Sequence, residues 1–490
     1  MKLKDLLKAL PLYYGKVNLE MEISKIEQDS RLVTAGTLFI CIDGEVVDGH
    51  QFAEQAAKNG AALILAERPV DVSAPVLIVR DTKRVMAILA DRFYNQPSQK
   101  MTLVGITGTN GKTTVSHLVE QILVDSGEIT GLIGTMYRKI AGEIYHTKNT
   151  TPDSLTLQKT FREMLDKKVT SSVMEVSSHA LVQSRVYGSD YDVAVFTNLS
   201  QDHLDYHQTM EEYAYAKSLL FAQLGNRYQE VHPKYAVLNA DDPVSKTMQR
   251  ATSAPIVTYA VDSDADFRAV NIRTTGEGST FELLTPVGKK NMHAQMIGKF
   301  SIYNILAALA TAFVLKKDID QAMQSLSKIK GVAGRFELVH AGQDFPVIVD
   351  YAHTPDGLLN VLETVKEFAN GRIFVVVGCG GDRDKGKRPK MAQIAVKYAT
   401  DPIFTSDNPR TENPRTIIDD MIAGVPDNSY IVRKERREAI EYAIREAKHG
   451  DVVLIAGKGH EDYQIIGTEK INFDDRVVAK EAILKKQTLE

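Results

Sequence analysis

The segment Val104-Gly105-Ile106-Thr107-Gly108-Thr109-Asn110-Gly111-Lys112-Thr113-Thr114 decides the fold of this chain. An apolar run, Met101 to Ile106, leads into a turn rich in Gly and Thr, and helical periodicity follows from Val115 to Asp125. A strand, a glycine-rich loop and a helix N-terminus in this order form an anion site, because free backbone N–H groups and the positive end of the helix dipole face the ligand. The segment therefore predicts a phosphate-binding loop.

Individual side chains of this loop fit a nucleotide triphosphate. Lys112 can reach the β- and γ-phosphates, and the hydroxyl of Thr113 or Thr114 can ligate Mg²⁺. The strict Walker spacing would put its first glycine at position 106, which is Ile106, so the loop is a variant. A plain glycine turn between strand and helix is the alternative. Because Gly-Lys-Thr-Thr directly follows a strand run, we favour binding of ATP or a related nucleotide.

Composition narrows the class of protein. A chain of 490 residues should hold about three domains, at roughly 150 residues each. Its 43% hydrophobic and 25% charged residues are typical of a globular protein. A net charge of −4 argues against a general nucleic-acid or membrane-surface binder, so anionic ligands would need local clusters of Arg and Lys. Cys41 and Cys379 lack metal or redox spacing, which predicts buried, reduced thiols in the cytosol.

The N-terminal segment, residues 1–10, has leucines on one helical face, interrupted by Asp5 and Lys8 and ended by Pro11. This pattern predicts a short amphipathic helix and not a signal peptide. No apolar stretch approaches transmembrane length. We therefore expect a soluble, cytoplasmic protein without membrane insertion.

Strands and helices alternate in three blocks, which predicts an α/β fold with mostly parallel sheets. A linker at Asn95–Lys100 and a glycine turn at Gly331–Gly334 separate the blocks, giving domains at 1–98, 99–331 and 332–490. We expect a smaller N-terminal α/β domain, a central phosphate-loop ATPase domain and a Rossmann-like C-terminal domain. The strands expected from apolar runs are 37–42, 62–66, 75–78, 172–176, 193–197, 236–239, 346–349, 372–378, 402–405 and 451–456, and helices are expected at 52–59 and 82–93.

Glu175 and His203 follow two of these strands in the same predicted sheet as Lys112. Carboxylate oxygens and an occasional imidazole are the ligands that a nucleotide-bound Mg²⁺ takes. Taken singly, the two would be a solvated strand end and a loop histidine, but their shared sheet edge favours a functional role. Lys217 lies on a predicted helix, where periodicity alone predicts an exposed lysine.

Strand ends of the third block carry clustered charges. The segments are 350–355, the glycine- and cation-rich 378–389, Asp407-Asn408-Pro409-Arg410 and Gly457-Lys458-Gly459-His460-Glu461. In open α/β sheets, ligands bind at the carboxyl ends of the strands. Paired cationic and anionic groups there suit a zwitterionic ligand such as an amino acid.

Taken together, these motifs closely resemble those of the Mur ligases of peptidoglycan synthesis, especially the subgroup that makes the UDP-MurNAc-tripeptide. The likeness covers nearly the whole chain. Asp29-Ser30-Arg31, Gly36-Thr37-Leu38-Phe39 and Asp48-Gly49 resemble the family's uridine-binding domain, and Gly108 to Thr114 resembles its shortened phosphate loop. Each motif is moderately specific, and their order and combination are highly so.

The resemblance implies a role for each matching position. The ATP-binding residues would be Gly108, Thr109, Asn110, Gly111, Lys112, Thr113, Thr114, Asn304, Arg335 and Asp350. The nucleotide-linked muramoyl peptide would be held by Ser30, Thr150, Thr151, Ser177, Gln183 and Arg185. Mg²⁺ would be held by Thr113, Glu175, His203 and a Lys217 carbamylated by CO₂, with Lys112, Lys217 and His203 as the catalytic residues. One position departs from the pattern: Ser301 stands where many relatives carry Asn.

The implied reaction is an ATP-driven amide synthesis by a monomer. The terminal carboxylate of UDP-MurNAc-L-Ala-D-Glu would attack the γ-phosphate to give an acyl phosphate. The incoming amine would then attack that carbonyl through a tetrahedral intermediate and release phosphate. Phosphoryl transfer of this kind needs positioning and charge neutralisation and no nucleophilic side chain.

The amino acid implied is meso-diaminopimelate. Asp407-Asn408-Pro409-Arg410 resembles the signature of the enzymes that add it, with Arg410 pairing with the distal carboxylate, which L-lysine lacks. Arg383 resembles a second carboxylate contact, and Gly457 and Glu461 resemble partners of the distal amino group. The alternatives are the same ligase using L-lysine, another superfamily ligase such as a folylpolyglutamate or cyanophycin synthetase, and a nucleotide-dependent switch protein without ligase turnover.

Overall fold

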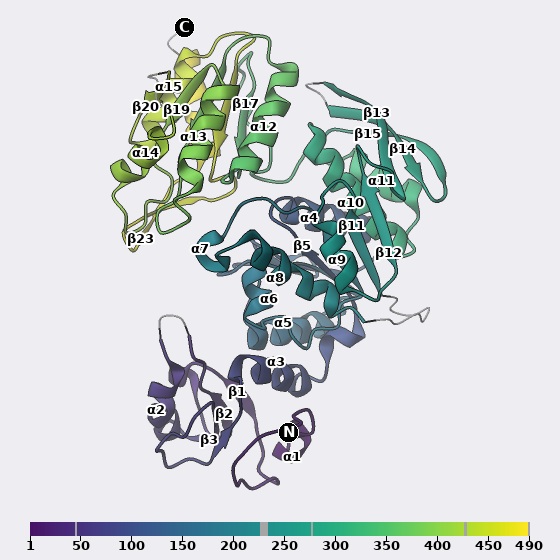
Figure 1. Cartoon of the computed structure of the whole chain (residues 1–490), viewed down its shortest axis with the longest axis vertical. Coiled ribbons are helices and arrows are strands. Elements are labelled where there is room, and N and C mark those ends of the chain that lie inside the picture. Colours follow the sequence, from purple (N-terminus) through teal and green to yellow (C-terminus); the bar gives the residue numbers. More distant parts are fainter. Residues whose placement is uncertain (45–46, 226–233, 276–277, 426–428, 489–490) are drawn as a thin grey trace.

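The computed structural model describes residues 1–44, 47–225, 234–275, 278–425 and 429–488. Three α/β domains follow one another along the long axis of the molecule, with the central domain between the N- and C-terminal ones (Figure 1). In the described part of the chain the strands form four sheets: one in each domain and a separate hairpin in the last. The predicted α/β class with mostly parallel sheets is confirmed.

The N-terminal domain is a parallel sheet in the order β1-β2-β3-β4 with helices on both faces. Side chains of β2 alternate between the faces: Leu38 packs with α1 and α3, and Phe39 packs with α2. The elements are β1 Lys25–Glu27, β2 Thr37–Ile40, β3 Ala61–Ala66, β4 Val76–Ile78, α1 Leu3–Leu7, α2 Ala53–Lys58 and α3 Thr82–Phe93.

The central sheet places the phosphate loop at its middle. Its strand order is β15-β14-β13-β12-β11-β10-β5-β9-β6-β7-β8, and β5 lies parallel between β10 and β9. The carboxyl ends of these three strands therefore meet beside the loop that follows β5. The strands are β5 Thr102–Thr107, β6 Thr130–Ile133, β7 Arg138–Ile140, β8 Glu143–Tyr145, β9 Ser171–Glu175, β10 Val193–Phe196, β11 Tyr235–Asn239, β12 Ile256–Ala260, β13 Phe267–Thr275, β14 Gly278–Thr285 and β15 Gly288–Ala294.

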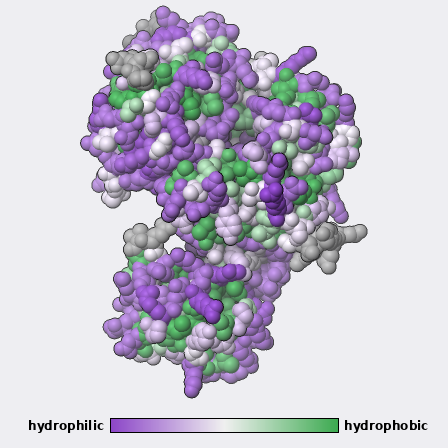
Figure 2. Space-filling view, viewed as in Figure 1, coloured by the Kyte–Doolittle hydropathy of each residue, from purple (hydrophilic) through white to green (hydrophobic). Residues whose placement is uncertain are grey.

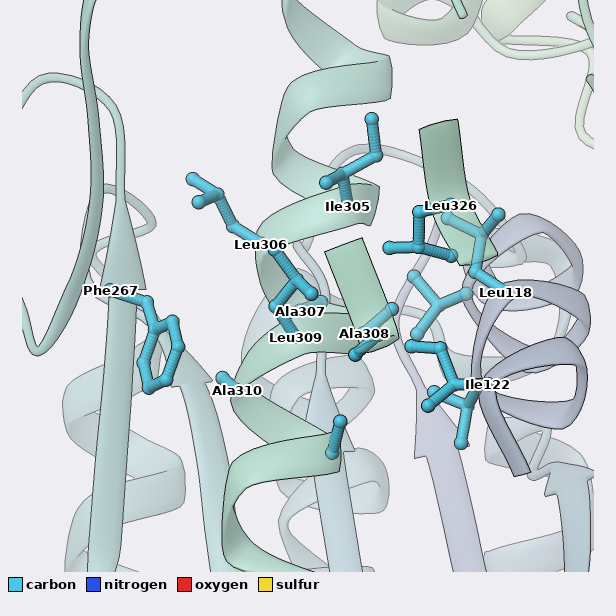
Figure 3. Packing of buried hydrophobic residues seen from close by; sticks show 14 of the residues in the cluster. Leu118, Ile122, Phe267, Ile305, Leu306, Ala307, Ala308, Leu309, Ala310 and Leu326 are labelled. Carbon is cyan, nitrogen blue, oxygen red and sulfur yellow. The ribbon is translucent and has the colours of Figure 1, made fainter. Parts of the chain in front are cut away.

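Helices cover both faces of this sheet. On one face α4 packs against α10, where Leu118 and Ile122 lie near Ile305 and Ala308 (Figure 3). Alanines along α10 allow this close approach and keep the helix almost wholly buried. The helices are α4 Lys112–Asp125, α5 Ser154–Asp166, α6 Ser178–Val182, α7 Leu204–His207, α8 Met210–Ala222, α9 Ser245–Ala251, α10 Lys299–Val314 and α11 Ile319–Ser327.

The C-terminal sheet has the order β16-β17-β21-β18-β19-β20 and is parallel except for β16. Helices α12, α13 and α14 pack on one face and α15 and α16 on the other. A hairpin, β22–β23, extends from the domain. The elements are β16 Glu337–Leu338, β17 Val347–Asp350, β18 Ile373–Val377, β19 Asp401–Phe404, β20 Ile431–Val432, β21 Val452–Ala456, β22 Tyr463–Ile466, β23 Glu469–Asn472, α12 Pro355–Phe368, α13 Lys387–Tyr398, α14 Pro414–Ile422, α15 Arg436–Glu446 and α16 Asp475–Gln487.

Some features differ from the sequence-based expectation. Antiparallel strands extend both edges of the central sheet, whereas the sequence predicts strands only in its parallel part. The predicted linker at 95–100 contains a 3-10 turn, Pro97–Lys100, in which Ser98 is buried and accepts a hydrogen bond from the backbone N–H of Asp190. Turn-forming residues do not reveal whether a turn is free or packed against a domain.

The hydrophilic surface and the buried cysteines match what the composition predicts. Hydrophilic side chains dominate the face seen in Figure 2, with apolar residues in small patches. Across the described ranges, no helix combines the length and apolar character needed to span a bilayer. Cys41 and Cys379 are both buried and unpaired, as predicted.

Candidate active site

The loop after β5 depends on two glycines. Gly108 has φ +150°, and a Cβ there would lie 1.8 Å from Thr197 Oγ1. Gly111 has φ +87°, and a Cβ there would lie 2.5 Å from Asn304 Oδ1. Both the backbone conformation and the close approach exclude a side chain. The loop is thus wedged between the end of β10 and helix α10.

A pocket of about 470 Å³ surrounds this loop, with walls from the central and C-terminal domains. It brings together most of the predicted nucleotide and metal residues. Those that line it are Thr109, Asn110, Gly111, Lys112, Thr113, Thr114, Glu175, His203, Lys217, Asn304, Arg335 and Asp350. Thr150 and Ser177, two of the residues predicted to hold the muramoyl peptide, line it as well.

Two lysines converge on one carbonyl oxygen. Lys112 Nζ donates hydrogen bonds to the carbonyls of Gly108 (2.9 Å) and Thr109 (2.8 Å), and Lys217 Nζ also donates to Gly108 (2.9 Å). Lys217 is only 1% exposed, so the exposed lysine expected from helical periodicity alone is wrong. Burial and the nearby charge of Lys112 hold the pKa of Lys217 well below its ordinary value. The pocket therefore favours an anionic ligand.

Glu175 is not a solvated strand end, because its carboxylate is fully buried. It accepts a hydrogen bond from Thr113 Oγ1 (3.1 Å) and two from Thr135, through the backbone N–H (3.0 Å) and Oγ1 (3.0 Å). Arg335 Nη2, from the start of the C-terminal domain, donates to Thr113 Oγ1 (3.0 Å). The hydroxyl and carboxylate thus form one fixed group of oxygen donors beside the phosphate loop.

His203 stands in a separate group. Its backbone is left-handed (φ +55°), an uncommon conformation for a non-glycine residue. Burial lowers the pKa of His203 to about 3, so its imidazole is neutral near pH 7 and keeps a lone pair. Both His203 and Lys217 lie beside the ring of Tyr213. Among the described contacts none joins His203 to Glu175, so the four predicted metal ligands form two pairs, Thr113 with Glu175 and His203 with Lys217.

Asp202 links the central domain to the C-terminal domain. Its carboxylate lies 3.3 Å from His203 Nε2, 3.7 Å from His353 Nε2 and 3.5 Å from Lys387 Nζ. Burial opposes its ionisation, but the neighbouring His353 and Lys387 hold the pKa of Asp202 well below its ordinary value. Sequence reasoning assigned these residues no role. Their one signal was that Asp202, His353 and Lys387 each lie in a strand-end segment.

Asp350 fixes the segment that carries Arg335. Its carboxylate accepts hydrogen bonds from the backbone N–H groups of Phe336 (2.6 Å) and Ala352 (2.7 Å). Burial raises the pKa of Asp350. The Arg335 guanidinium lies 4.2 Å from the centroid of the Tyr351 ring. Arg335 and Asp350, the two predicted ATP-binding residues near the boundary between the central and C-terminal domains, therefore belong to one structural unit.

The predicted muramoyl-peptide residues of the central domain form one network. Ser177 N donates to Thr151 Oγ1 (3.0 Å), and Arg185 donates to the Thr151 carbonyl (3.0 Å) and to Gln183 Oε1 (2.6 Å). Ser30 lies apart in the N-terminal domain. It is buried, its carbonyl accepts from Asn59, and no described contact joins it to this network.

The predicted amino-acid residues meet in the C-terminal domain. Asn408 Nδ2 donates to Glu461 Oε2 (2.9 Å), and a Cβ on Gly457 would lie 2.8 Å from Asp407 Oδ2. Arg410 has left-handed backbone (φ +51°) and donates to the carbonyl of Gly381 (2.8 Å). In the described part of the chain Arg410 has no ion-pair partner.

Arg383 joins this cluster from a second loop. A Cβ on Gly380 would lie 2.9 Å from Arg410 Nη1 and 3.8 Å from Arg383 Cγ, so the two arginines flank Gly380. Arg383 is exposed, and its guanidinium donates only to the carbonyl of Asp382 among the described groups (2.9 Å). Both cations are therefore placed to receive carboxylates.

Sequence reasoning missed one wall of the pocket. Asn239 and Asp241 line it near Asn304, and Tyr303 donates a hydrogen bond from its hydroxyl to Asp241 Oδ2 (2.6 Å). Asn239 ends a correctly predicted strand, so the strand-end rule could have found it. Nothing local marks Tyr303.

The fold and the pocket define a multidomain phosphate-loop protein. Three family models match the chain: the Mur ligase middle domain at 106–312, the Mur ligase glutamate ligase domain at 334–459 and the Mur ligase family catalytic domain at 22–94. It is 67% identical over 487 residues to the UDP-N-acetylmuramoyl-L-alanyl-D-glutamate–2,6-diaminopimelate ligase of Listeria monocytogenes, and 56% identical over 484 residues to that of Bacillus licheniformis, with 99% of each chain covered. The chain belongs to the Mur ligase family.

Solved structures agree with this family. A structure of a UDP-N-acetylmuramoyl-L-alanyl-D-glutamate–2,6-diaminopimelate ligase aligns with a TM-score of 0.71 at 33% identity and covers 99% of this chain and 100% of its own. A MurF ligase from Thermotoga maritima in complex with ADP aligns with a TM-score of 0.64 at 19% identity, covering 95% of this chain and 97% of its own. The second likeness supports the fold alone.

Gly108→Ala should disrupt the phosphate loop, because the added methyl group meets Thr197 Oγ1 at 1.8 Å. We expect ADP binding, measured by calorimetric titration, to weaken at least about tenfold, which corresponds to about 1.4 kcal/mol. Gly127→Ala is the matched control, since Gly127 also has positive φ (+83°) but nothing within 4 Å of its Cβ position. Equal ADP affinity of the two variants would contradict the assigned role of Gly108.

Proposed function

We propose that this chain is an ATP-dependent ligase that joins meso-diaminopimelate to UDP-MurNAc-L-Ala-D-Glu in the synthesis of peptidoglycan precursors. The observation that carries the proposal is the pocket in which the phosphate loop faces the C-terminal domain. That domain also carries the cluster of charged and polar side chains that is suited to bind an amino acid. Full-length relatives named as ligases of 2,6-diaminopimelate support it. We assign UDP binding to residues 1–98, ATP binding to 99–331 and amino-acid binding to 332–490, in a cytoplasmic monomer.

The proposed reaction has two steps. An oxygen of the terminal carboxylate forms a bond to the γ-phosphorus of ATP, and the bond from that phosphorus to ADP breaks. The amine of diaminopimelate then forms a bond to the acyl carbon and loses a proton as inorganic phosphate leaves. Lys112, directed at the Gly108 carbonyl, is suited to neutralise the charge that develops on the transferred phosphoryl group.

The donor set beside the loop fits Mg²⁺, which takes oxygen ligands and is usually held by one or two carboxylates plus the phosphates of its nucleotide. The hydroxyl of Thr113 and the carboxylate of Glu175 would hold it, with neutral His203 and a carbamylated Lys217 near a second position. Bound there, the ion would neutralise phosphate charge. Within the described ranges no group of three or more His, Cys, Asp or Glu side chains is arranged for a metal. In this proposal the phosphates of the nucleotide supply further ligands.

The surroundings of Lys217 support its proposed carbamylation. CO₂ reacts with the neutral amine, and burial together with Lys112 lowers the pKa of Lys217, which enlarges the neutral fraction. We expect ¹³C-labelled bicarbonate to give a protein-bound carbamate resonance that is absent from Lys217→Ala. Turnover of that variant should fall about 100-fold or more, as for the loss of other groups that stabilise transition-state charge. A wild-type enzyme without that resonance, or a fully active Lys217→Ala variant, would refute this role.

The choice of amino acid is assigned to Arg410. Its guanidinium is half-buried beside Gly381 and has no carboxylate partner among the described residues, so the distal carboxylate of diaminopimelate can pair with it. L-Lysine would leave this cation unpaired, which costs several kcal/mol when the site is buried.

Arg410→Ala should raise the KM for diaminopimelate by at least about tenfold while leaving the KM for ATP within about twofold. Steady-state phosphate release gives both constants. Arg437→Ala, an exposed arginine of the same domain, should change neither. Equal losses for both substrates would disprove the specificity role.

The function itself is tested by phosphate release with ATP, Mg²⁺ and UDP-MurNAc-L-Ala-D-Glu, comparing meso-diaminopimelate with L-lysine. We expect turnover with diaminopimelate and at least about 100-fold lower kcat/KM with lysine. Turnover with lysine alone would keep the reaction and overturn the specificity. Phosphate release at the same rate with and without an amino acid would indicate a nucleotide-dependent switch. No phosphate release with either amino acid would point to another ligase of the superfamily.

A further inference from the structure

Two fully buried cations adjoin the amino-acid cluster without belonging to it. The side chains of Arg388, in the first turn of α13, and Lys458, after β21, are both 0% exposed. Neither lines the pocket around the phosphate loop. Neither has a part in the proposed reaction, so their burial needs another explanation.

Arg388 clamps the loop that carries Arg410. Its guanidinium donates to both carboxylate oxygens of Glu412 (3.0 and 2.8 Å), to Asp420 Oδ2 (2.7 Å) and to the Gly380 carbonyl (3.3 Å). Glu412 lies two residues after Arg410, and Gly380 lies between the two arginines of the cluster. The hydrogen bonds of Arg388 hold the pKa of Glu412 at about 2, so the pair stays charged.

The two loops joined by Arg388 are also locked to each other. Glu412 Oε1 accepts from the backbone N–H of Asp382 (2.6 Å), and Asp382 accepts from Thr411 Oγ1 (2.8 Å). A Cβ on Gly381 would lie 1.9 Å from the Pro409 carbonyl, which shows how closely the backbones approach. The guanidinium of Arg410 therefore has its position set by a unit in which Arg388 is the central donor.

Lys458 makes a second, separate unit. Its Nζ donates to Asn408 Oδ1 (3.1 Å) and Glu461 Oε2 (3.0 Å), and Asn408 Nδ2 donates to the same Glu461 oxygen (2.9 Å). Lys458 is also the first of the cations that offset the burial of Asp407 and lower its pKa. It thus fixes the residues proposed to receive the distal amino group and leaves the arginines untouched.

Stability alone does not account for these cations. Removing a charge from water costs several kcal/mol, and well-packed apolar residues often replace buried ion pairs without loss of stability. Buried polar groups can fix a unique geometry through their hydrogen bonds. Lys458 donates to Asn408 and Glu461 of the amino-acid cluster, and three of the four hydrogen bonds of Arg388 go to Glu412 and Gly380, on the loops that carry the two arginines. This arrangement favours a positioning role.

We propose that Arg388 and Lys458 are positioning residues for two different groups of the amino-acid substrate. Arg388 holds the loops that recognise the distal carboxylate, and Lys458 holds Glu461, directly and through Asn408, for recognition of the distal amino group. The inference rests on the proposed function and deepens it. It requires that the two recognitions can be lost separately.

Two substrate analogues separate the two roles. L-Lysine lacks the distal carboxylate, and 2-aminopimelate lacks the distal amino group. Arg388→Met should lower the ratio of kcat/KM for diaminopimelate to that for lysine at least about tenfold and leave the ratio to 2-aminopimelate within about threefold. Lys458→Met should lower the ratio of kcat/KM for diaminopimelate to that for 2-aminopimelate at least about tenfold and leave the ratio to lysine within about threefold. Arg437→Met, at the exposed Arg437, is the control and should leave both ratios unchanged.

The outcomes separate this inference from the proposed function. Wild-type enzyme that does not use diaminopimelate overturns the function before any variant is compared. Active wild type with variants that lose all three substrates by one factor overturns the positioning roles, because a general packing defect acts in that way. Thermal unfolding and circular dichroism verify that each variant is folded. Should a Met variant not fold, Arg388→Lys or Lys458→Gln keeps one polar donor but loses part of the hydrogen bonds, so the same ratio should still fall. An unchanged ratio in these variants also overturns the inference.

Discussion

The carbonyl oxygen of Gly108 accepts hydrogen bonds from two buried lysines, Lys112 and Lys217, and the rest of the pocket is arranged around this pair of amines. Two ammonium groups so close together in a poorly solvated pocket would repel strongly, so burial and Lys112 hold the pKa of Lys217 well below its ordinary value. Glu175 and Asp202 lie nearby and favour the charged form of Lys112. A glycine is required at position 108, since any side chain would collide with Thr197 and displace the carbonyl that both lysines share.

Charged side chains around this pocket also join the central domain to the C-terminal domain. Asp202 belongs to the central domain but finds His353 and Lys387 in the C-terminal domain, and Arg335 reaches back to Thr113. These contacts join the two domains across the pocket. Because the proposed phosphate and amino-acid sites are on different domains, their alignment depends on contacts such as these.

Local sequence determined what could be predicted. The strand, loop and helix around Lys112 are continuous in sequence, so their periodicities and glycines were sufficient, and parallel strands bring their ends together by geometry. Lys217 was different: helix α8 buries residues on most of its sides, so periodicity does not reveal which face is exposed. The contacts of Asp202 with Lys387 depend on how two domains meet, which no local pattern encodes. No strand was predicted at β13, and nothing local showed that this segment would extend the central sheet.

The two loops that carry Arg410 and Asp382 show how the C-terminal domain maintains a strained backbone. Arg410 and Asp382 both have left-handed backbone (φ +51° and +53°), which costs each residue of order 1 kcal/mol or more and persists only when the surroundings enforce it. The surroundings here are the hydrogen bonds from Arg388 and the close backbone contact at Gly381. Because the guanidinium of Arg410 is already fixed in the folded protein, it loses little conformational entropy when a carboxylate binds. The entropy of ordering this side chain is lost on folding and not on binding. An amino acid without that carboxylate meets the same rigid site and leaves its cation unpaired, which turns rigidity into discrimination.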